Sequence, residues 1–280
     1  MTRKACVIGW PISHSRSPII HGYWLKRYGI EGSYERLPVK PEDLSGFLAR
    51  LRGNGFVGCN VTLPHKEAAF RVVRTADAAT KKLGVVNTVF ERDGELWGTS
   101  TDGEGFIASL RNDLPDWQVK GRTVVILGAG GATRAIVGAL VDEGAERILI
   151  ANRTHARAEE LQRDFGPRIE PRDWTEAPRL LGAADLLVNT TSLGMTAQPP
   201  LDIDLAHLPA SAVVTDIVYT PLETDLLKRA KARGNPTVPG LGMLLHQAVR
   251  GFELWFGTRP QVTPELYDLV AADIDPGYRR

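Results

Sequence analysis

Several polar residues stand where predicted strands end or loops begin, which is where ligands bind in open α/β sheets. The first cluster covers residues 9–18 and leads into a predicted helix. Within it, Ser15 and Ser17 present two hydroxyls beside the backbone N–H groups of the helix start, which suits a carboxylate. Helix capping by Ser17, with Pro18 at the first helical position, is the alternative. Both roles are compatible, and capping does not account for Ser15.

A second cluster, residues 60–66, lies at the end of a predicted buried strand, where polar residues are followed by Lys66. A lysine next to an apolar strand end can lose solvation, which lowers its pKa towards the range useful for proton transfer. An ordinary surface lysine is the alternative at this position. Residues 84–88 and 99–103 form the third and fourth clusters, and Asp102 could simply cap the helix that begins there.

Residues 123–135 are predicted to form a buried strand, a glycine turn and the start of a helix. Gly128 lets the chain turn tightly, and Gly130 lets the backbone approach a pyrophosphate held at the helix N-terminus. The third position of the dinucleotide-binding fingerprint, residue 133, is Thr instead of Gly. Glycine turns in βα units are often only structural. A second strand that ends about 20 residues further on favours dinucleotide binding here.

The end of that second strand indicates which dinucleotide is bound. Residues 147–151 lead into Asn152, Arg153 and Thr154, where an NAD-binding protein carries Asp or Glu for the ribose 2′-hydroxyl. An acid would repel a 2′-phosphate, whereas Arg153, Thr154 and Arg157 can bind one through charge-assisted hydrogen bonds. A solvated arginine at a helix N-terminus is the alternative. The charge at this position predicts NADP rather than NAD.

The overall charge excludes binding modes that need a strong electrostatic field. The 280 residues carry 34 Lys and Arg against 33 Asp and Glu, so the formal net charge is +1. This balance gives no field that would recruit nucleic acid or an acidic membrane surface. The two cysteines, Cys6 and Cys59, lie in apolar runs and are predicted to be buried core thiols. We expect a cytoplasmic protein without a signal peptide, a membrane span or a structural metal.

The elements that position these residues alternate between strand and helix patterns, which is typical of parallel sheets built from βαβ units. The predicted strands are Ala5–Gly9, Tyr34–Val39, Phe56–Thr62, Thr123–Leu127, Arg147–Ala151, Leu186–Thr190 and Val213–Val218. The predicted helices are Pro18–Tyr28, Pro41–Arg52, Ala132–Glu143, Ala156–Phe165 and Glu223–Arg233. A glycine follows each helix, where positive φ at a C-terminus favours this residue, at Gly29, Gly53, Gly144, Gly166 and Gly234.

Two further patterns interrupt the alternation. Residues 87–99 predict a β-hairpin whose turn is formed by Asp93 and Gly94. Residues 112–118 are polar and contain a proline, so we place a domain junction nearby, with a crossing helix at about Gly103–Leu110. Near the other end, Leu241–Phe256 has the apolar spacing of an amphipathic helix. Periodicity alone does not show which domain this last helix joins.

The clusters and the glycine turn together resemble one family, the shikimate dehydrogenases. The resemblance rests on stretches that run in order along nearly the whole chain: GWPISHSRSP with His21, GCNVTLPHK, GVVNTV, STDGEGF, ILGAGGATRA, ANRT, NTTSLGM, DIVYTPLET, and GLGMLLHQ followed by FELW. Three positions depart from the family's usual residues, namely Gly22, Ser100 and Thr133. None of these departures removes a catalytic group.

The resemblance implies roles for individual residues. It implies that Lys66 and Asp102 form the catalytic pair, and that the shikimate or 3-dehydroshikimate substrate is bound by Ser15, Ser17, Thr62, Lys66, Asn87, Asp102, Tyr219 and Gln247. It implies that NADP is bound by Gly128, Ala129, Gly130, Gly131, Ala132, Asn152, Arg153, Thr154, Arg157, Ile217 and Gly240. The implied reaction is the reversible, NADPH-dependent reduction of 3-dehydroshikimate to shikimate, in the biosynthesis of chorismate and the aromatic amino acids.

The resemblance also implies a two-domain α/β fold. Residues 1–102, completed by 241–280, are expected to form the substrate-binding domain, and residues 103–240 a Rossmann domain for NADP. A monomer or homodimer is expected. Two other functions stay open: a quinate/shikimate dehydrogenase with relaxed substrate or cofactor use, and a non-catalytic NADP-binding regulator. Arg153 disfavours the first, because an NAD-preferring enzyme should carry an acid there. A regulator would not need Lys66, Asp102, Asn87 and Gln247 together.

Overall fold

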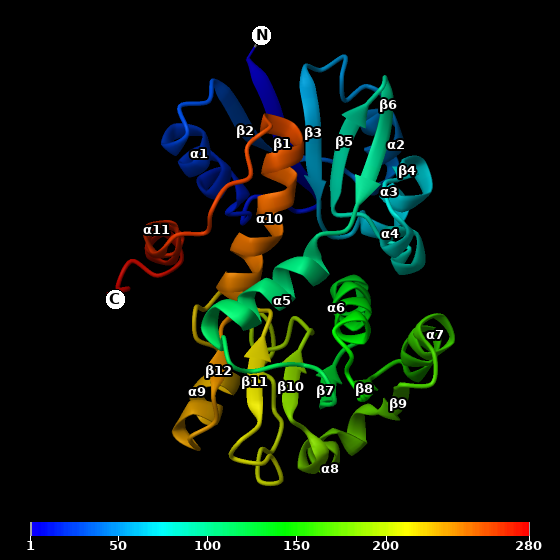
Figure 1. The fold of residues 1–280 in the computed structure, drawn as a ribbon, viewed down its shortest axis with the longest axis vertical. Helices are drawn as coiled ribbons and strands as arrows, with labels where there is room; N and C mark the ends of the chain where they lie inside the picture. The colour runs from blue at the N-terminus through cyan, green and yellow to red at the C-terminus, as the bar shows by residue number, and fades with distance from the viewer. Residues whose placement is uncertain (1, 280) are drawn as a thin grey trace. The chain divides into compact units, whose positions relative to one another are not determined.

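The computed structural model describes residues 2–279 of the chain. These residues form two compact units, which are described separately. The first comprises the chain up to Asp102 together with Gln247–Val270, and the second comprises Gly103–His246 together with the segment from Ala271 on. Each unit is built on its own six-stranded sheet, as the alternation of strands and helices in the sequence predicts (Figure 1). The α/β fold class is confirmed.

The sheet of the first unit is mixed, with the strand order β2-β1-β3-β5-β6-β4. Its strands are β1 (Arg3–Gly9), β2 (Gly32–Pro38), β3 (Phe56–Val61), β4 (Arg74–Thr75), β5 (Thr88–Arg92) and β6 (Glu95–Thr99). Strands β1, β2 and β3 are parallel, whereas β5 pairs antiparallel with both β3 and β6. The β5–β6 pair is the predicted hairpin, and its turn residues Asp93 and Gly94 have the positive φ angles of 55° and 80° that such a turn requires.

Helices of the first unit pack on both faces of this sheet. They are α1 (Ser17–Arg27), the 3₁₀ turn η1 (Pro41–Asp43), α2 (Leu44–Ala49), α3 (Lys66–Val72) and α4 (Ala78–Leu83). One face buries Cys6, Cys59 and Val61 against leucines of α2 and Ala69 of α3. On the other face, Trp24 of α1 packs edge-on against Phe252 of α10 (Gly240–Phe256) with ring centroids 5.4 Å apart. Burial on both faces explains why the buried part of β1, residues 5–9, and most of β3 are apolar.

The sheet of the second unit is entirely parallel, with the order β12-β11-β10-β7-β8-β9. Its strands are β7 (Thr123–Leu127), β8 (Arg147–Asn152), β9 (Ile169–Asp173), β10 (Leu186–Asn189), β11 (Val213–Asp216) and β12 (Thr237–Val238). Its remaining elements are α5 (Asp102–Asp113), α6 (Gly131–Asp142), α7 (His155–Phe165), η2 (Trp174–Glu176), α8 (Ala177–Leu180), η3 (Leu181–Ala183) and α9 (Asp225–Ala232). Helix α11 (Pro264–Ile274) begins in residues of the first unit and ends in residues of the second.

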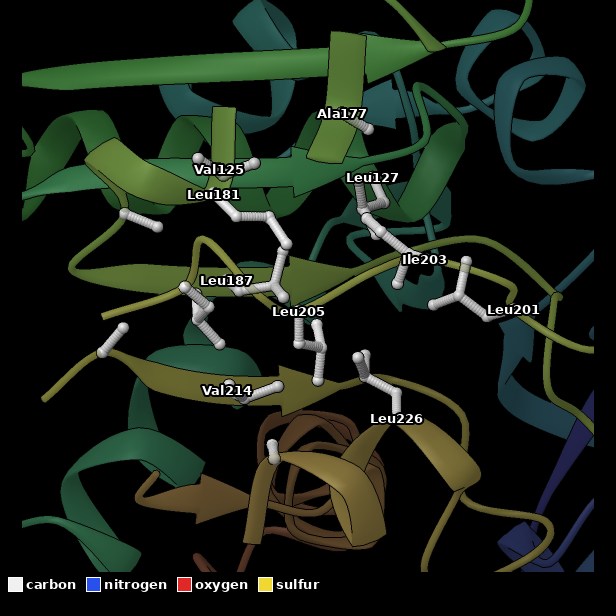
Figure 2. Packing of buried hydrophobic residues seen from close by; sticks show 14 of the residues in the cluster. Val125, Leu127, Ala177, Leu181, Leu187, Leu201, Ile203, Leu205, Val214 and Leu226 are labelled. Carbon is white, nitrogen blue, oxygen red and sulfur yellow. The ribbon is translucent and has the colours of Figure 1, made fainter. Parts of the chain in front are cut away.

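The core of the second unit lies on the sheet and under a long connection between two strands. Figure 2 shows Leu127 of β7 and Leu187 of β10 facing apolar side chains of the segment that joins β10 to β11, among them Ile203 and Leu205. Leu226 of α9 closes the same cluster. Apolar packing of this kind orders a segment that has no helix or strand of its own.

Several sequence predictions need correction. The single helix expected over Pro41–Arg52 is the 3₁₀ turn η1 followed by the short helix α2, and its left-handed glycine is Gly55, with φ +83°, rather than Gly53. Composition does not distinguish Gly53 from Gly55 as the residue that ends this helix. The elements α3, α4, α8, α11, β4, β9 and β12 were not predicted. Most of these are short or polar, so their hydrophobic periodicity is weak.

The two cysteines are confirmed as buried free thiols. Cys6 on β1 and Cys59 on β3 are register partners, so their side chains are neighbours on the sheet. A hydrogen bond between the two side chains, together with burial, raises the pKa of Cys6 far above its usual range. The Cys6 thiol therefore stays protonated, and both cysteines contribute to the core as small apolar groups. Within residues 2–279, no helix is both long enough and apolar enough to cross a membrane.

Candidate active site

A lysine–aspartate pair lies at the centre of the polar residues of the first unit. Lys66 is the first residue of α3 and Asp102 is the first residue of α5, and the Lys66 ammonium donates a hydrogen bond to Asp102 Oδ2. The two side chains are only 14% and 8% exposed, so water screens their attraction poorly. The position of Asp102 at a helix N-terminus also stabilises its negative charge. The loops after β3 and β6 thus bring together two residues that are far apart in the sequence.

Asn87 connects this pair to its surroundings. Its Nδ2 group donates to Asp102 Oδ1 at 2.9 Å and to Thr101 Oγ1 at 3.0 Å, and it lies 3.4 Å from Gln247 Oε1. Its Oδ1 atom accepts the Thr101 N–H at 2.9 Å. Both carboxylate oxygens of Asp102 therefore have donors, one from Lys66 and one from Asn87. The carboxylate is held in one orientation, and two ammonium N–H bonds of Lys66 remain for a ligand.

The helix α10 brings Gln247 into this network. Thr101 donates its hydroxyl hydrogen to the backbone carbonyl of Gln247 at 2.8 Å, and Gln247 is 9% exposed. Further along α10, the Trp255 indole N–H donates to the Val89 carbonyl of β5 at 2.9 Å. These two contacts hold Gln247–Phe256 on the first unit. The amphipathic pattern predicted the helix, but its position beside Asn87 is a tertiary feature.

The two serines predicted to hold a carboxylate are buried neighbours. The Ser15 hydroxyl donates to Ser17 Oγ at 3.2 Å and accepts the Ser17 N–H at 3.3 Å. Helix α1 begins at Ser17 itself, and its N-cap residue, Arg16, makes no side-chain capping bond. The capping role considered for Ser17 is therefore wrong, because the helix starts one residue earlier than a Ser17 cap would require. Pro18 lies in the first turn, at the second helical position rather than the predicted first.

The structure adds a buried tyrosine that no sequence pattern singled out, and pairs it with Asn60, the first residue of the second polar cluster. The Tyr34 hydroxyl donates to Asn60 Oδ1 at 2.5 Å, and Asn60 Nδ2 donates to Thr88 Oγ1 at 3.2 Å. Thr88 in turn donates to Asn87 Oδ1 at 3.1 Å. Burial raises the pKa of Tyr34, and a hydrogen bond with Ser17 opposes that rise. A continuous polar chain thus links the serines to the lysine–aspartate pair.

The only sequence signals for these residues were weak. Asn60 begins the second polar cluster, and Thr101 precedes Asp102, but no spacing rule connects either of them with Tyr34. The nearby His21 is also buried, and its ring stacks on Tyr34 with centroids 4.0 Å apart. Burial lowers the pKa of His21 to about 3, so this histidine is neutral at physiological pH. Among residues 2–279, no group of three or more His, Cys, Asp or Glu could hold a metal ion.

The glycine turn of the second unit has room for a ligand against its backbone. Gly128 has φ +105°, a conformation that favours glycine, and an added Cβ there would lie 2.8 Å from Thr190 Oγ1. At Gly130 and Gly131 an added Cβ would meet nothing within 4 Å. Helix α6 begins at Gly131, so its first N–H groups point out of this turn without intrahelical acceptors. The turn, with Ala129 and Ala132, fits a pyrophosphate.

The residues after β8 carry exposed positive charge. Arg153, Thr154 and Arg157 are exposed, and Asn152 Nδ2 donates to the Thr154 carbonyl at 2.8 Å. Two exposed guanidinium groups at this place fit a phosphate on the ribose 2′-oxygen. The donor set therefore fits NADP better than NAD.

A buried carboxylate fixes the loop that follows β11. Asp216 Oδ1 accepts Asn189 Nδ2 and the Val218 N–H, both at 3.0 Å, and Oδ2 accepts the Thr224 hydroxyl at 2.8 Å. The loop carries two residues that the family resemblance implicated, Ile217 and Tyr219. Gly240, a third, lies against the same loop, where an added Cβ would be 2.6 Å from backbone atoms of residues 216 and 217. Close packing is thus the reason for glycine at this position.

Burial raises the pKa of Asp216 from 3.8 to about 6, despite the three hydrogen bonds that favour the charged form. The folded protein therefore binds this proton more tightly than the unfolded chain. We expect the contribution of Asp216 to the free energy of unfolding to fall as pH rises from about 4 to about 6, by up to about 3 kcal/mol.

Urea unfolding of the wild type and of Asp216→Asn at pH values from about 4 to about 7 measures this contribution. The stability difference between the two proteins should change between about pH 4 and about pH 6 and stay constant at higher pH. The matched control is Asp204→Asn, the same substitution at an exposed aspartate of the same unit, with which the change seen for Asp216→Asn is compared. A difference that does not vary with pH would contradict the assignment.

The fold and these sites together define a class of protein. One unit holds a paired lysine and aspartate among buried amides and hydroxyls, and the other holds a glycine turn at a helix N-terminus on a parallel sheet. This combination is that of a two-domain α/β dehydrogenase. Models of three protein domains match the chain: the shikimate dehydrogenase substrate binding domain over residues 7–89, shikimate / quinate 5-dehydrogenase over 110–197, and the shikimate 5′-dehydrogenase C-terminal domain over 240–264.

Individual relatives agree with the domain models. The chain is 55% identical to shikimate dehydrogenase (NADP⁺) from Methylocella silvestris, over 97% of both chains. It is 36% identical to a crystal structure of shikimate 5-dehydrogenase from Thermus thermophilus in complex with NADP(H) and shikimate, with a TM-score of 0.85 over 97% of this chain and 99% of that one. The chain belongs to the shikimate dehydrogenase family.

The same fold also supports related activities. Quinate dehydrogenase from Corynebacterium glutamicum, crystallised with NAD, has a TM-score of 0.88 and 31% identity over 97% of this chain and 99% of that one. Its likeness to this chain in fold is as close as that of the shikimate-bound structure. Substrate and cofactor preference therefore depend on individual side chains rather than on the fold.

Proposed function

We propose that this protein is an NADP-dependent shikimate dehydrogenase, which reversibly reduces 3-dehydroshikimate to shikimate on the route to chorismate and the aromatic amino acids. The observation that carries the proposal is the buried arrangement of Lys66, Asp102, Asn87 and Gln247. It offers donors and acceptors for a small polyhydroxylated ligand, together with a group that can transfer a proton. The 55% identity to a relative named shikimate dehydrogenase (NADP⁺) supports the same substrate and cofactor.

The proposed reaction develops negative charge on the oxygen of the 3-keto group, and this charge needs a positively charged partner. When bound, NADPH supplies the hydride that reduces the 3-keto carbon. The oxygen then develops negative charge, and the Lys66 ammonium stabilises that charge and delivers the proton. Asp102 holds Lys66 by an ion pair and is itself held by Asn87, so the ammonium group is oriented before the substrate arrives. In the oxidation of shikimate the same groups accept the proton.

The remaining polar residues are assigned to substrate binding. Ser15 and Ser17 bind the substrate carboxylate, because their hydroxyls lie side by side at the start of α1. Thr62, Asn87, Asp102 and Gln247 surround the ring hydroxyls with Lys66, and Tyr219 acts on the carboxylate side. The first unit is accordingly the substrate-binding domain.

The second unit is proposed to bind NADP. Gly128 to Ala132 receive the pyrophosphate, and Asn152, Arg153, Thr154 and Arg157 receive the adenosine 2′-phosphate. Ile217 and Gly240 complete the cofactor site. The support for NADP over NAD is the positive charge after β8, where an acid would repel the additional phosphate. We also propose a cytoplasmic enzyme that is a monomer or a homodimer.

The test is a set of four steady-state rates, with shikimate or quinate as substrate and NADP⁺ or NAD⁺ as cofactor. We expect kcat/KM to be largest for shikimate with NADP⁺. Comparable rates with quinate would favour a quinate/shikimate dehydrogenase instead. NADP⁺ binding without turnover of either substrate would favour a non-catalytic regulator.

The role of Arg153 is measured in the same assay. Loss of one charge-assisted contact with the 2′-phosphate should raise the KM for NADP⁺ in Arg153→Ser by about tenfold to a hundredfold, with little effect on NAD⁺. Arg163→Ser is the matched control, because Arg163 is an exposed arginine in the last turn of the same helix, α7. Equal effects on both cofactors would remove Arg153 from the 2′-phosphate site.

A further inference from the structure

Two threonine hydroxyls form a hydrogen-bond chain across the glycine turn of the second unit. Thr190 donates its only hydroxyl hydrogen to the Leu127 carbonyl at 2.8 Å, and its oxygen lies 2.7 Å from the Thr133 oxygen. Thr133 must therefore be the donor in the contact between the two hydroxyls. Its oxygen accepts the Gly130 N–H at 2.9 Å. The chain has one direction: Gly130 N–H to Thr133, Thr133 to Thr190, and Thr190 to Leu127.

This chain joins three segments that meet at the turn. Leu127 is the last residue of β7, Gly130 and Thr133 lie at the start of α6, and Thr190 follows β10. Thr133 is fully buried, so water does not compete for its hydroxyl. Thr190 also lies directly against Gly128, the residue of the turn with positive φ. The path of the turn is thus fixed from both sides.

The hydrogen-bond chain also changes which amide groups are available to a ligand. The N–H of Gly130 is occupied by Thr133, which leaves the first N–H groups of α6 itself, those of Gly131 and Ala132, to face an anion. A glycine at position 133, as in the common fingerprint, would provide no hydroxyl and would leave the Gly130 N–H unbound within the turn. Threonine at position 133 therefore makes the Gly130 N–H unavailable to a ligand and, in return, fixes the conformation of the turn.

We propose that Thr133 and Thr190 are positioning residues that hold the glycine turn in its phosphate-binding conformation before the dinucleotide binds. This inference rests on the proposed use of NADP. The two threonines belong to the second unit and the lysine–aspartate pair to the first, so the contribution proposed for the threonines is to cofactor affinity through an ordered turn. Without them, binding would have to order the turn at the expense of affinity.

The experiment is calorimetric titration of the full chain with NADP⁺, for the wild type and for Thr133→Val, Thr133→Ser and Thr190→Val. Valine keeps the shape of threonine and removes the hydroxyl, while serine keeps the hydroxyl. We expect Kd to rise about fivefold to tenfold in each valine variant, the effect of a lost neutral hydrogen bond, and Thr133→Ser to bind within about twofold of the wild type. The kcat at saturating NADP⁺ should not change.

A double variant and a control variant distinguish this positioning role from a general loss of stability. The double variant Thr133→Val/Thr190→Val should bind about as weakly as either single variant, because each one already breaks the chain. Thr123→Val is the matched control: Thr123 begins β7 at the opposite end of the same strand, and its replacement should leave Kd unchanged. Additive losses in the double variant, or an equal loss in Thr123→Val, would overturn the proposal.

Hydrogen exchange of the ligand-free protein tests the ordering directly. The Gly130 amide should exchange faster in both valine variants than in the wild type, while amides in the middle of α6 keep their protection. Unchanged exchange at Gly130 would overturn the inference whatever the affinities are. If the wild type itself fails to bind NADP⁺, the proposed function fails, and the exchange rates still decide whether the threonines order the turn.

Discussion

Replacing Lys66 with methionine should lower kcat for shikimate oxidation by about two to four orders of magnitude, the usual contribution of a positioned proton-transfer group. Methionine retains the length of the lysine side chain and loses its charge and its protons. Asp102 would keep its bond from Asn87 and lose the partner on its other oxygen. The affinity for NADP⁺ should not change, because the glycine turn and the residues after β8 belong to the other unit.

Steady-state kinetics and calorimetric titration with NADP⁺ separate these effects. Lys81→Met is the matched control, since Lys81 is an exposed lysine on α4 in the same unit. It should retain the activity of the wild type. If Lys66→Met lost only a few-fold in kcat with cofactor binding intact, Lys66 would not be the proton-transfer group, and the proposed mechanism would have to be abandoned.

The largest effect on stability is expected at Gly58, in the interior of β3. A Cβ at this position would lie 2.0 Å from Trp255 Nε1 and 2.4 Å from the Val89 carbonyl oxygen. These two atoms form a buried hydrogen bond of 2.9 Å, so alanine would have to displace the indole ring and break that bond. We expect Gly58→Ala to lower the free energy of unfolding by about 3–5 kcal/mol, from overpacking and the lost buried bond combined.

The same substitution at Gly22, Gly22→Ala, should change the free energy of unfolding in the opposite direction. Gly22 lies in the middle of α1, is exposed, and has open space where a Cβ would be placed. Alanine should raise stability there by about 0.5–1 kcal/mol, because it has the higher helix propensity. Urea unfolding of both variants gives the comparison. A Gly58→Ala protein as stable as the wild type would mean that α10 does not pack on β3 as described.

The substitution Gly58→Ala should also disturb the active site. Trp255 and Gln247 belong to the same helix, and the Trp255 bond to Val89 is one of the contacts that hold this helix beside Asn87. A displaced indole should therefore raise the KM for shikimate as well as lower stability.

Patterns that are local in the chain were sufficient for much of the fold. The strand Thr123–Leu127 is confirmed to the residue, and the hairpin around Asp93 and Gly94 is confirmed with its turn. Hydrophobic periodicity and turn-forming residues indicate backbone conformation within a few residues, so predictions based on them do not require tertiary information. The segment 41–55 is the counterexample, because Gly53 and Gly55 are both able to end a helix there and the sequence does not decide between them.

The types of chemistry were also determined by the sequence. A lysine after a buried strand, an aspartate at a helix start and arginines after a second strand are statements about residue type and position in the chain. They allowed proton transfer and favoured a phosphate-bearing cofactor, and the family resemblance then implied that Lys66 and Asp102 form the catalytic pair. They did not predict Tyr34, Asn60 or Thr101, because a hydrogen-bonding partner distant in sequence has no spacing rule.

The tertiary structure alone decided which of these residues act together. Lys66 and Asp102 form a pair, and Gln247 reaches Asn87 across 160 positions of the chain. It also decided that Thr133, which is only a departure from a fingerprint in the sequence, is bonded to Thr190 and to the turn. The physical reason is the same in each case: a side-chain hydrogen bond depends on distances of about 3 Å in space, and sequence separation contains no record of them.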